Sequence, residues 1–330
     1  MVDHGGLVNG ESIVVSVVVP AYNAARTLPD QLAALEHQDF DGVWEVLVVN
    51  NRSVDHTREV AGPFLEKLPL RVLEATERQG AAHARNVGVL EALGDYVAFC
   101  DADDVVAVDW LSQLVNSSSG DAVVAGTIDQ DTELNSLTVR RARHATRVEY
   151  PMGPASLGPV AWGSNMLVPR ELLIRIGLFD ESLGAGEDAE LCYRAFDSGA
   201  TLVSAPSAVV SYRLRDSPRA VYRRARLWAY EGLEFHRRYR SRGATKRSTR
   251  SMIRSVGWIA SRSPFIFRNP ERRIQWFEKL GTLIGHTREC LAPALSRNRF
   301  PGHSSAYSRF SLIAESANAA LLSYGRVPDL

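Results

Sequence analysis

Short apolar runs rich in valine and other β-branched residues alternate with longer segments of helical periodicity along the first two thirds of the chain. This alternation is typical of a parallel sheet covered by helices. The run at 13–19 is nearly continuous, which favours a strand buried on both faces. The runs that predict strands are 13–19, 44–49, 70–74, 96–100, 122–125, 166–168, 201–204 and 208–212.

The segments between these runs repeat apolar residues at helical spacing, and two of them lead into glycines suited to a helix C-terminus, Gly94 and Gly199. Residues 128–160 contain arginine, threonine, proline and glycine without a clear period, and we expect a hairpin or loop there. The pattern therefore predicts a doubly wound α/β fold. Its predicted helices are 26–37, 55–65, 81–93, 109–115, 171–176 and 187–198.

The character of the chain changes after Asp216, where long arginine-rich helical patterns replace the alternation. These patterns cover 219–239, 250–259, 271–281 and 304–322. Three parts follow from this division: an N-terminal tail (1–12), an α/β domain with a mainly parallel sheet (13–215) and a basic helical C-terminal region (216–330).

The charge balance supports the same division. The whole chain carries 38 Lys or Arg and 38 Asp or Glu, so its net charge gives no reason to expect nucleic acid as a partner. Residues 211–300, however, contain 22 Lys or Arg and only 6 Asp or Glu. A basic module is therefore attached to an acidic one.

Three cysteines, Cys100, Cys192 and Cys290, are an odd number without close spacing, which argues against a disulfide framework and a zinc site and fits a reducing compartment. The N-terminus lacks the basic-then-apolar pattern of a signal peptide. The longest apolar stretch, 13–22, is shorter than the roughly 20 residues that cross a bilayer. We therefore expect a cytoplasmic protein without a membrane-spanning segment.

Polar clusters follow the predicted strands, where the ligand of a doubly wound sheet binds. Pro20, Ala21, Tyr22 and Asn23 end the first strand, because proline cannot continue the ladder of hydrogen bonds. The ring of Tyr22 could face a nucleobase there or simply pack against the strand end.

The second strand is followed by Asn50–Asp55. The amide of Asn51 suits contact with the edge of a base, and Asp55 or Ser53 can cap the next helix. In the segment before the fourth strand, Arg85 and Asn86 offer hydrogen bonds to an anionic or ribosyl ligand, or form an exposed helix face.

The sharpest cluster is Asp101–Asp104, in which three carboxylates occupy four residues directly after a strand. Like charges at this spacing favour a cation, and Mg²⁺ or Mn²⁺ takes oxygen ligands of this kind. A solvated acidic turn that caps the following helix is the alternative. Asp188 lies near the start of a predicted helix, where the helix dipole favours its ionised form; it could act as a general base or only as a cap.

Taken together, in this order and at these intervals, the clusters resemble the inverting family 2 glycosyltransferases of the GT-A fold over residues 13–215. The segments that carry the resemblance are V-V-V-P-A-Y-N at 17–23, V-V-N-N-R-S-V-D-H-T at 48–57, G-A-A-H-A-R-N-V-G at 80–88, G-D-Y-V-A-F-C-D-A-D-D at 94–104, 163–170 and 177–188.

The resemblance implies a metal-dependent, inverting transfer of a sugar from a nucleotide-diphosphate sugar to an acceptor hydroxyl of a cell-envelope glycan, glycolipid or other glycoconjugate. Asp188 is then the catalytic base, and Asp103 with Asp101 holds Mg²⁺ or Mn²⁺. The donor would be bound by Pro20, Ala21, Tyr22, Asn23, Asn51, Arg85, Asp101 and Asp103. The acceptor would be bound by Trp162, Gly163, Ser164, Asn165 and Glu187.

The chain departs from the family pattern in three places. Asn50 and Asn51 stand where the family usually has an acidic residue, so uridine cannot be assumed as the base. Arg213 and Arg215 follow Tyr212 where many relatives place a histidine that contacts metal or phosphate, and guanidinium charge could replace it. The Q-x-x-R-W pattern of processive relatives is absent, which favours a single addition.

The basic helical region allows two interpretations. Its arginines could contact anionic lipid headgroups or a lipid-linked acceptor, at the inner face of a membrane, or could pair with the acidic domain. The residues concerned are Arg223, Arg224, Arg226, Arg237, Arg238 and Arg240, interleaved with Trp228, Tyr230 and Phe235.

Two other functions are alternatives. A nucleotidyltransferase should carry a glycine-rich loop after its first strand, which this chain lacks. A non-catalytic sugar-nucleotide binding module would not need Asp101, Asp103 and Asp188 together.

Overall fold

The computed structural model describes residues 7–8, 11–12, 14–143, 147–148, 159–239, 241, 249–265 and 268–295. Most of the expected tail at 1–12 and the predicted helix at 304–322 lie outside these residues. Within the tail, the two-residue strands β1 (Leu7–Val8) and β2 (Glu11–Ser12) pair with each other in antiparallel fashion.

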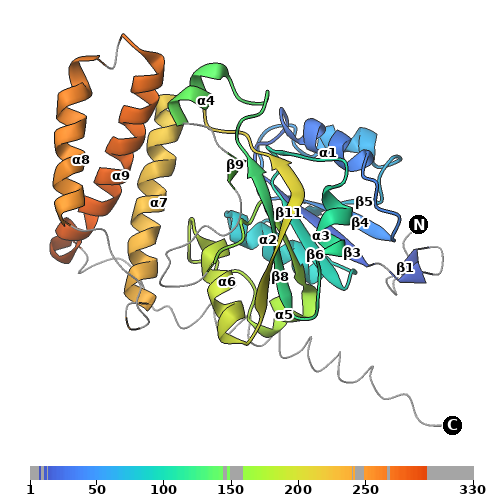
Figure 1. Cartoon of the computed structure of the whole chain (residues 1–330). Coiled ribbons are helices and arrows are strands. Elements are labelled where there is room, and N and C mark those ends of the chain that lie inside the picture. The colour runs from blue at the N-terminus through green and yellow to red at the C-terminus, as the bar shows by residue number, and fades with distance from the viewer. Residues whose placement is uncertain are drawn as a thin grey trace.

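A single mixed sheet forms the centre of the molecule (Figure 1). Its strands follow one another in space in the order β5-β4-β3-β6-β10-β8-β11-β7, and β9 pairs with β8. The pairs β5–β4, β4–β3, β3–β6 and β8–β11 are parallel, whereas β10 runs antiparallel between β6 and β8. The strands are β3 (Val15–Ala21), β4 (Trp44–Asn50), β5 (Leu70–Glu74), β6 (Tyr96–Cys100), β7 (Val105–Val106), β8 (Ala122–Asp129), β9 (Arg147–Val148), β10 (Asn165–Pro169) and β11 (Thr201–Ser211).

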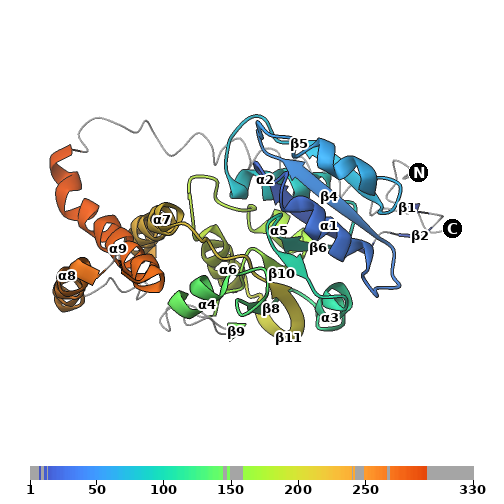
Figure 2. The same cartoon turned by 90° about the horizontal axis from the view of Figure 1, so that it is seen from above.

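Helices cover both faces of this sheet, as the doubly wound prediction requires (Figure 2). Helices α1 (Leu28–Glu36) and α3 (Trp110–Asn116) bury their apolar residues against one face. The other face is covered by α2 (Ala81–Glu91), α5 (Arg170–Arg175) and α6 (Glu187–Asp197). Gly88 of α2 faces Val18 so closely that a Cβ would collide with that side chain, so the small residue permits the contact between helix and sheet.

Four local predictions were wrong. The segment 55–65 forms a 3₁₀ helix, η1 (Glu59–Phe64), and the segment expected to be a hairpin or loop contains helix α4 (Leu137–Arg143). The two runs after 200 form one strand, β11, whose pairing with β8 shifts register between Ala205 and Val209. Gly94 does not end α2; a Cβ there would lie 2.6 Å from the backbone nitrogen of Ser16, so glycine allows two backbones to approach closely.

The described part of the C-terminal region contains α7 (Pro218–Tyr239), α8 (Thr249–Arg262), the short η3 (Ser263–Phe265) and α9 (Pro270–Leu295). Two glycines of α9, Gly281 and Gly285, lie against backbone carbonyls of α7, which lets these two helices pack closely. Leu214, Val221 and Ile274 share a small apolar core with Val139 and Ala142 of α4, so this region is joined to the sheet domain through α4. The boundary near 215 stays a prediction. None of the helices among the described residues has the length and apolar character to cross a bilayer.

Candidate active site

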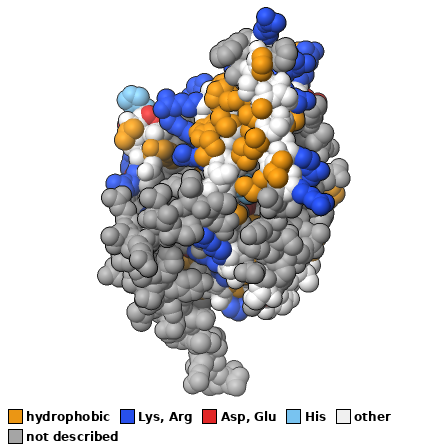
Figure 3. Space-filling view, turned by 90° about the vertical axis from the view of Figure 1, so that its left-hand side faces the viewer, with side chains coloured by type: hydrophobic (Ala, Val, Ile, Leu, Met, Phe, Trp, Pro, Cys, Tyr) orange, Lys and Arg blue, Asp and Glu red, His pale blue; other side chains and the backbone are white. Residues whose placement is uncertain are grey.

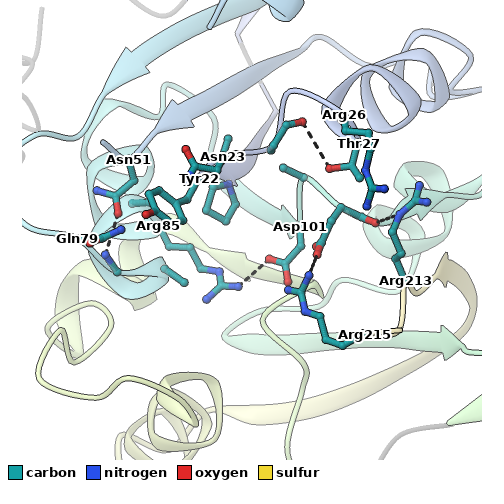
Figure 4. Close-up of a pocket in the computed structure, with 18 residues that line it drawn as sticks. Tyr22, Asn23, Arg26, Thr27, Asn51, Gln79, Arg85, Asp101, Arg213 and Arg215 are labelled. Atoms are coloured by element: carbon teal, nitrogen blue, oxygen red, sulfur yellow. Dashed lines mark hydrogen bonds and ion pairs between the residues drawn. The ribbon is translucent and has the colours of Figure 1, made fainter. Parts of the chain in front are cut away.

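A cavity of about 410 Å³ opens at the carboxyl ends of β3, β4 and β6 (Figure 4). This is the position at which an open α/β sheet binds its ligand, because loops diverge there from neighbouring strands. The residues that line it are Pro20, Ala21, Tyr22, Asn23, Ala24, Arg26, Thr27, Asn51, Gln79, Gly80, Ala81, Ala84, Arg85, Asp101, Ala102, Asp103, Arg213 and Arg215. All eight residues predicted to bind the donor are therefore brought to one cavity.

The loop after β3 is fixed by the loop after β4. Asn23 has a positive φ of 49°; its N–H donates to Ser53 Oγ at 2.9 Å, and its Oδ1 accepts from the N–H of Val54 at 2.9 Å. Asp55 Oδ2 accepts from the N–H of Ala25 at 3.1 Å. Ser53 and Asp55 thus hold the neighbouring loop instead of capping the helix that follows them, which corrects that prediction. Tyr22 is left 52% exposed at the edge of the cavity.

The side chain of Asn51 is engaged by the protein itself. Its Nδ2 donates to the carbonyls of Ala75 and Arg78, both at 2.7 Å, and its Oδ1 accepts from the N–H of Gly80 at 2.8 Å. In this conformation Asn51 shapes the loop that enters α2, and its amide offers no free donor to a base. Asn51 lines the cavity, as predicted, but its amide binds the protein backbone and not a base.

Three carboxylates gather on the opposite side of the cavity. Asp101, Asp103 and Asp104 each place an oxygen within 4.8 Å of the others. Asp104 is fully buried; one oxygen accepts from the N–H of Arg213 at 2.8 Å, and Oδ2 has no partner among the described residues. Burial and the neighbouring carboxylates raise the pKa of Asp104 well above its usual value. A buried oxygen without a partner in an all-oxygen donor set fits a hard divalent cation.

Arg85 connects this acidic group with the start of α6. Its guanidinium lies 2.8 Å from Asp101 Oδ1 and 2.7 Å from Glu187 Oε1, and its side chain is only 4% exposed. The two carboxylates outweigh the effect of burial and raise the pKa of Arg85, so it stays charged. Gly163 makes room for it: a Cβ there would lie 3.1 Å from the guanidinium carbon.

Asp188, the predicted base, lies next to Glu187 and is half-buried. Its Oδ2 accepts from the N–H of Gly163 at 3.0 Å, and its Oδ1 accepts from the N–H of Ala189 at 2.8 Å. Burial, followed by the charge of Glu187, raises the pKa of Asp188 to about 6. The N–H groups of Gly163 and Ala189 favour the ionised form, as expected at a helix start, but burial and Glu187 outweigh them. A carboxylate with this pKa is better matched to proton transfer near neutrality than an ordinary aspartate.

Of the five residues predicted to contact an acceptor, three interact with residues near Asp188 or with α7, and two are buried. Trp162 stacks on Trp228 of α7 with ring centroids 5.7 Å apart, Gly163 contacts Asp188 as described, and Glu187 is paired with Arg85. Ser164 is buried, with a relative exposure of 4%.

Asn165 is fully buried and cannot contact an acceptor, which corrects the prediction for that residue. Its Nδ2 donates to the carbonyls of Thr127 and Ala208, both at 2.9 Å, and its Oδ1 accepts from Trp110 Nε1 at 2.8 Å. It is a structural link between β10, β8, β11 and α3.

Arg26 and Thr27 line the cavity and were not predicted from the sequence. No motif marks them; the only available signal was the position of Arg26 three residues after the P-A-Y-N turn. Arg213 and Arg215, which depart from the family pattern, also line the cavity.

Residues 16–177 match the family model described as Glycosyl transferase family 2. Glycosyltransferase AglE of Haloferax volcanii is 31% identical over 199 residues, which are 59% of this chain and 65% of that protein. Glycosyltransferase GlyG of Streptococcus pneumoniae is 31% identical over 124 residues, which are 36% of this chain and 41% of that protein. The matched segments thus cover less than two thirds of either relative.

Among the solved structures, two that resemble most of the chain show its fold. Mannosyltransferase PcManGT from Pyrobaculum calidifontis, in complex with GDP-Man and Mn²⁺, has a TM-score of 0.53 at 23% identity and covers 93% of this chain and 80% of its own. Residues 1–349 of S. aureus TarS, in complex with UDP-GlcNAc, have a TM-score of 0.50 at 21% identity and cover 84% of this chain and 92% of their own. At these identities the similarity concerns the fold.

The mainly parallel sheet with helices on both faces, together with the similarity to PcManGT, shows a fold of the GT-A type. The chain belongs to glycosyltransferase family 2, on the match of its sheet domain and on its curated relatives.

Proposed function

We propose that this protein is a metal-dependent, inverting glycosyltransferase that moves a sugar from a nucleotide-diphosphate sugar to a hydroxyl of a cell-envelope glycan, glycolipid or other glycoconjugate. The observation that carries the proposal is Arg85, which touches Asp101 of the acidic group and Glu187 beside Asp188. One guanidinium therefore links the part of the cavity lining suited to a cation and diphosphate with the start of α6, where Glu187 and Asp188 lie outside that lining.

The residues of this chain divide the reaction between them. Asp188, held by the N–H groups of Gly163 and Ala189, takes the proton from the acceptor hydroxyl. The oxygen then attacks the anomeric carbon from the face opposite the nucleotide, so the new bond forms with inverted configuration as the bond to the diphosphate breaks. A divalent cation held by Asp101 and Asp103 would supply Lewis-acid stabilisation of the departing diphosphate.

Relatives and structural neighbours support the substrate classes. The PcManGT structure contains GDP-Man and Mn²⁺, the TarS structure contains UDP-GlcNAc, and TarS is named a poly(ribitol-phosphate) N-acetylglucosaminyltransferase. From these proteins we infer only the substrate classes of this chain: a nucleotide-diphosphate sugar as donor and a glycan or lipid-linked acceptor. The exposed ring of Tyr22 and the stacked Trp162 are the side chains proposed to face the base and the acceptor.

A panel of UDP-, GDP- and dTDP-sugars, with and without Mn²⁺, tests the donor class. A ligand that binds only the native state raises the melting temperature, and at a hundredfold excess over its Kd it stabilises by about 2.7 kcal/mol. We expect one family of donors to raise the melting temperature only when Mn²⁺ is present. No shift with any donor would contradict the proposal.

The product separates this function from the alternatives. A glycosyltransferase releases a nucleoside diphosphate from the donor, a nucleotidyltransferase acting on a nucleoside triphosphate releases pyrophosphate, and a binding module releases neither. Chromatography of the reaction mixture distinguishes these outcomes directly.

We also propose peripheral contact with an anionic membrane at its inner, cytoplasmic face, through α8 and not through the arginines of α7. Arginines of α7 face the sheet domain: Arg238 pairs with Asp180, and Arg224 lies over the rings of Tyr212 and Trp228. For these residues, pairing with the acidic domain is the better interpretation.

Helix α8 presents a different surface. Ile253 and Val256 are 67% and 52% exposed, and Arg250 and Arg254 are exposed beside them. The helix contains no acidic residue. Figure 3 shows apolar side chains gathered on this side of the molecule with Lys and Arg around them. Such a surface suits an anionic membrane, because the apolar side chains can enter the boundary between headgroups and acyl chains while the guanidinium groups bind the headgroups.

Co-sedimentation with vesicles tests this contact. Each basic residue near an anionic surface contributes about 1 kcal/mol. We therefore expect Arg250→Glu with Arg254→Glu to weaken binding to phosphatidylglycerol vesicles by tenfold or more, and Ile253→Asp to do the same. The exposed Val108→Asp, in the sheet domain, is the control. Equal sedimentation of all variants would contradict the contact. Binding to uncharged phosphatidylcholine vesicles but not to phosphatidylglycerol vesicles would contradict it as well.

A further inference from the structure

Helix α7 of the C-terminal region lies beside α6, the helix that carries Asp188 (Figure 2). The loop 176–186 joins α5 to α6. Arg238, near the end of α7, pairs with Asp180 of this loop and donates to Ser182 Oγ at 3.0 Å. Burial would raise the pKa of Asp180, but hydrogen bonds from Ser182 and Arg238 outweigh it and lower that pKa below its usual value. The ion pair is therefore charged on both sides at neutral pH.

The middle of the same loop also lies close to α7. A Cβ at Gly184 would lie 3.1 Å from Glu231 Oε1 and 3.3 Å from Leu227 Cδ1, both on α7. Two residues later, Gly186 begins α6 with a φ of 80°, in the left-handed region that favours glycine. Asp188 is the second residue of α6, so the course of the loop determines where its carboxylate lies.

The opposite side of the loop is held by α2. Asn86 Nδ2 donates to the carbonyl of Phe179 at 2.9 Å, and Asn86 Oδ1 accepts from the N–H of Phe179 at 2.9 Å. Glu181 accepts from Asn86 Nδ2 at 2.9 Å and lies 3.1 Å from His83 Nδ1. The loop is thus fixed between a helix of the sheet domain and a helix of the C-terminal region.

A second segment beside the base also rests on α7. Trp162 stacks on Trp228 of α7, and the next residue, Gly163, donates its N–H to Asp188 Oδ2 at 3.0 Å. Both segments next to Asp188 are therefore in contact with one helix of the C-terminal region.

We propose that α7 positions the base, and that Arg238 is the positioning residue that holds the loop before Asp188 through its ion pair with Asp180. This inference rests on the proposed function, in which Asp188 takes the proton from the acceptor. Arg238 is not among the residues that line the cavity, so it acts through the loop and not on the donor. The match to the family model ends at residue 177, so residues outside the matched segment build this part of the site.

Release of nucleoside diphosphate with water as the acceptor tests this role without a known acceptor glycan. Water attacks the anomeric carbon, its proton goes to Asp188, and the bond to the diphosphate breaks. The donor is the UDP-, GDP- or dTDP-sugar that the wild type hydrolyses fastest with Mn²⁺. A misplacement of about 1 Å can cost a hundredfold in rate, so Arg238→Gln should lower kcat by about tenfold or more. The KM for the donor should stay at the wild-type value, because the donor cavity is unchanged.

Further variants show whether the effect runs through the ion pair. Asp180→Asn should lower kcat as Arg238→Gln does, and the double variant should be no slower than the slower single variant, because both changes remove the same contact. Arg238→Lys keeps the charge beside Asp180, so it should retain more of the wild-type kcat than glutamine does. Arg140→Gln is the matched control: Arg140 of α4 is 28% exposed, like Arg238, and pairs with Asp131. Its kinetics should equal those of the wild type.

Titration of the Asp188 carboxyl, followed by NMR, needs no substrate. Burial is the main cause that raises the pKa of Asp188 to about 6, and a loosened loop admits water. Arg238→Gln should therefore lower this pKa toward the ordinary range, since Glu187 and Arg85, the charged groups that face Asp188, are unchanged. Arg140→Gln should titrate as the wild type does. If Arg238→Gln does not fold, Arg238→Lys takes its place, with the same direction of change.

The outcomes separate this role from the proposed function. A wild-type kcat or a wild-type titration of Asp188 in Arg238→Gln would overturn the role of Arg238 and leave the glycosyltransferase proposal intact. Additive losses in the double variant, or a loss of donor binding equal to the loss of kcat, would overturn it as well. A wild-type protein that binds no nucleotide sugar, with or without Mn²⁺, would instead contradict the proposed donor class, and the titration would still test the loop.

Discussion

Replacing Asp188 with Asn is expected to lower kcat by about a thousandfold, because a positioned general base contributes roughly two to four orders of magnitude. Asparagine keeps the size of the side chain and one oxygen that can accept from the N–H of Gly163 or Ala189. Donor binding should therefore stay near the wild-type level. The measurements are nucleoside diphosphate release by chromatography and donor binding by thermal shift.

The same carboxylate determines the pH dependence. Since the pKa of Asp188 is raised to about 6, the base is protonated below that pH, and kcat/KM of the wild type should fall as the pH drops through 6. The residual activity of Asp188→Asn should lack this acidic limb. Asp197→Asn, at the exposed end of the same helix, is the control. A variant at position 188 that retains wild-type turnover would rule out its role as base.

Replacing Arg85 with Met should cost about 3 kcal/mol of unfolding free energy, because removing one partner of a buried ionic group leaves charge uncompensated. Asp101 and Glu187 would then face each other across an apolar side chain. At about 2–4 °C per kcal/mol for a domain of this size, the melting temperature should fall by roughly 10 °C. Thermal unfolding at neutral pH measures the effect.

Acid should reduce this difference. The stabilisation by Arg85 exists only while its carboxylate partners are ionised, and burial raises the pKa of Asp101 above its usual value, so the stabilisation is lost as the pH falls through that raised pKa. Near pH 4 the two proteins should therefore melt closer together. Arg58→Met, which breaks an exposed pair, should change stability by less than about 1 kcal/mol. An equal loss at both pH values would show that packing, and not charge, explains the effect.

The sheet was largely predictable because most of its strands are buried on both faces. Residues 70–74 and 96–100 were placed with the observed bounds, and the other predicted runs fall within a few residues of observed strands, whereas β7 and β9 were not predicted. Burial on both faces requires nearly continuous apolar runs, which few other structures produce. The strand ends then led directly to the cavity, because ligands of such sheets bind where strands end.

Features that depend on distant partners could not be predicted. Helix α4 contains three arginines and a weak local pattern, yet it is held by α9: Gln275 donates to the carbonyl of Ala142, and Arg143 pairs with Glu278. The sequence near α4 does not indicate these contacts, because their partners lie more than 130 residues away in the chain. Likewise, nothing near Asn51 or Asn165 indicates that the amide is already satisfied inside the protein.

The antiparallel strand β10 has a consequence for how such an enzyme could diversify. Asn165 pairs in register with Cys100, so the residues just before β10 and the residues just after β6 emerge side by side at the same edge of the sheet. Because the amide of Asn165 anchors this junction from within, a substitution at Trp162 should leave the acidic turn at 101–104 in place. Acceptor preference, which is proposed to involve Trp162, could then change in evolution while the proposed donor site is inherited unchanged.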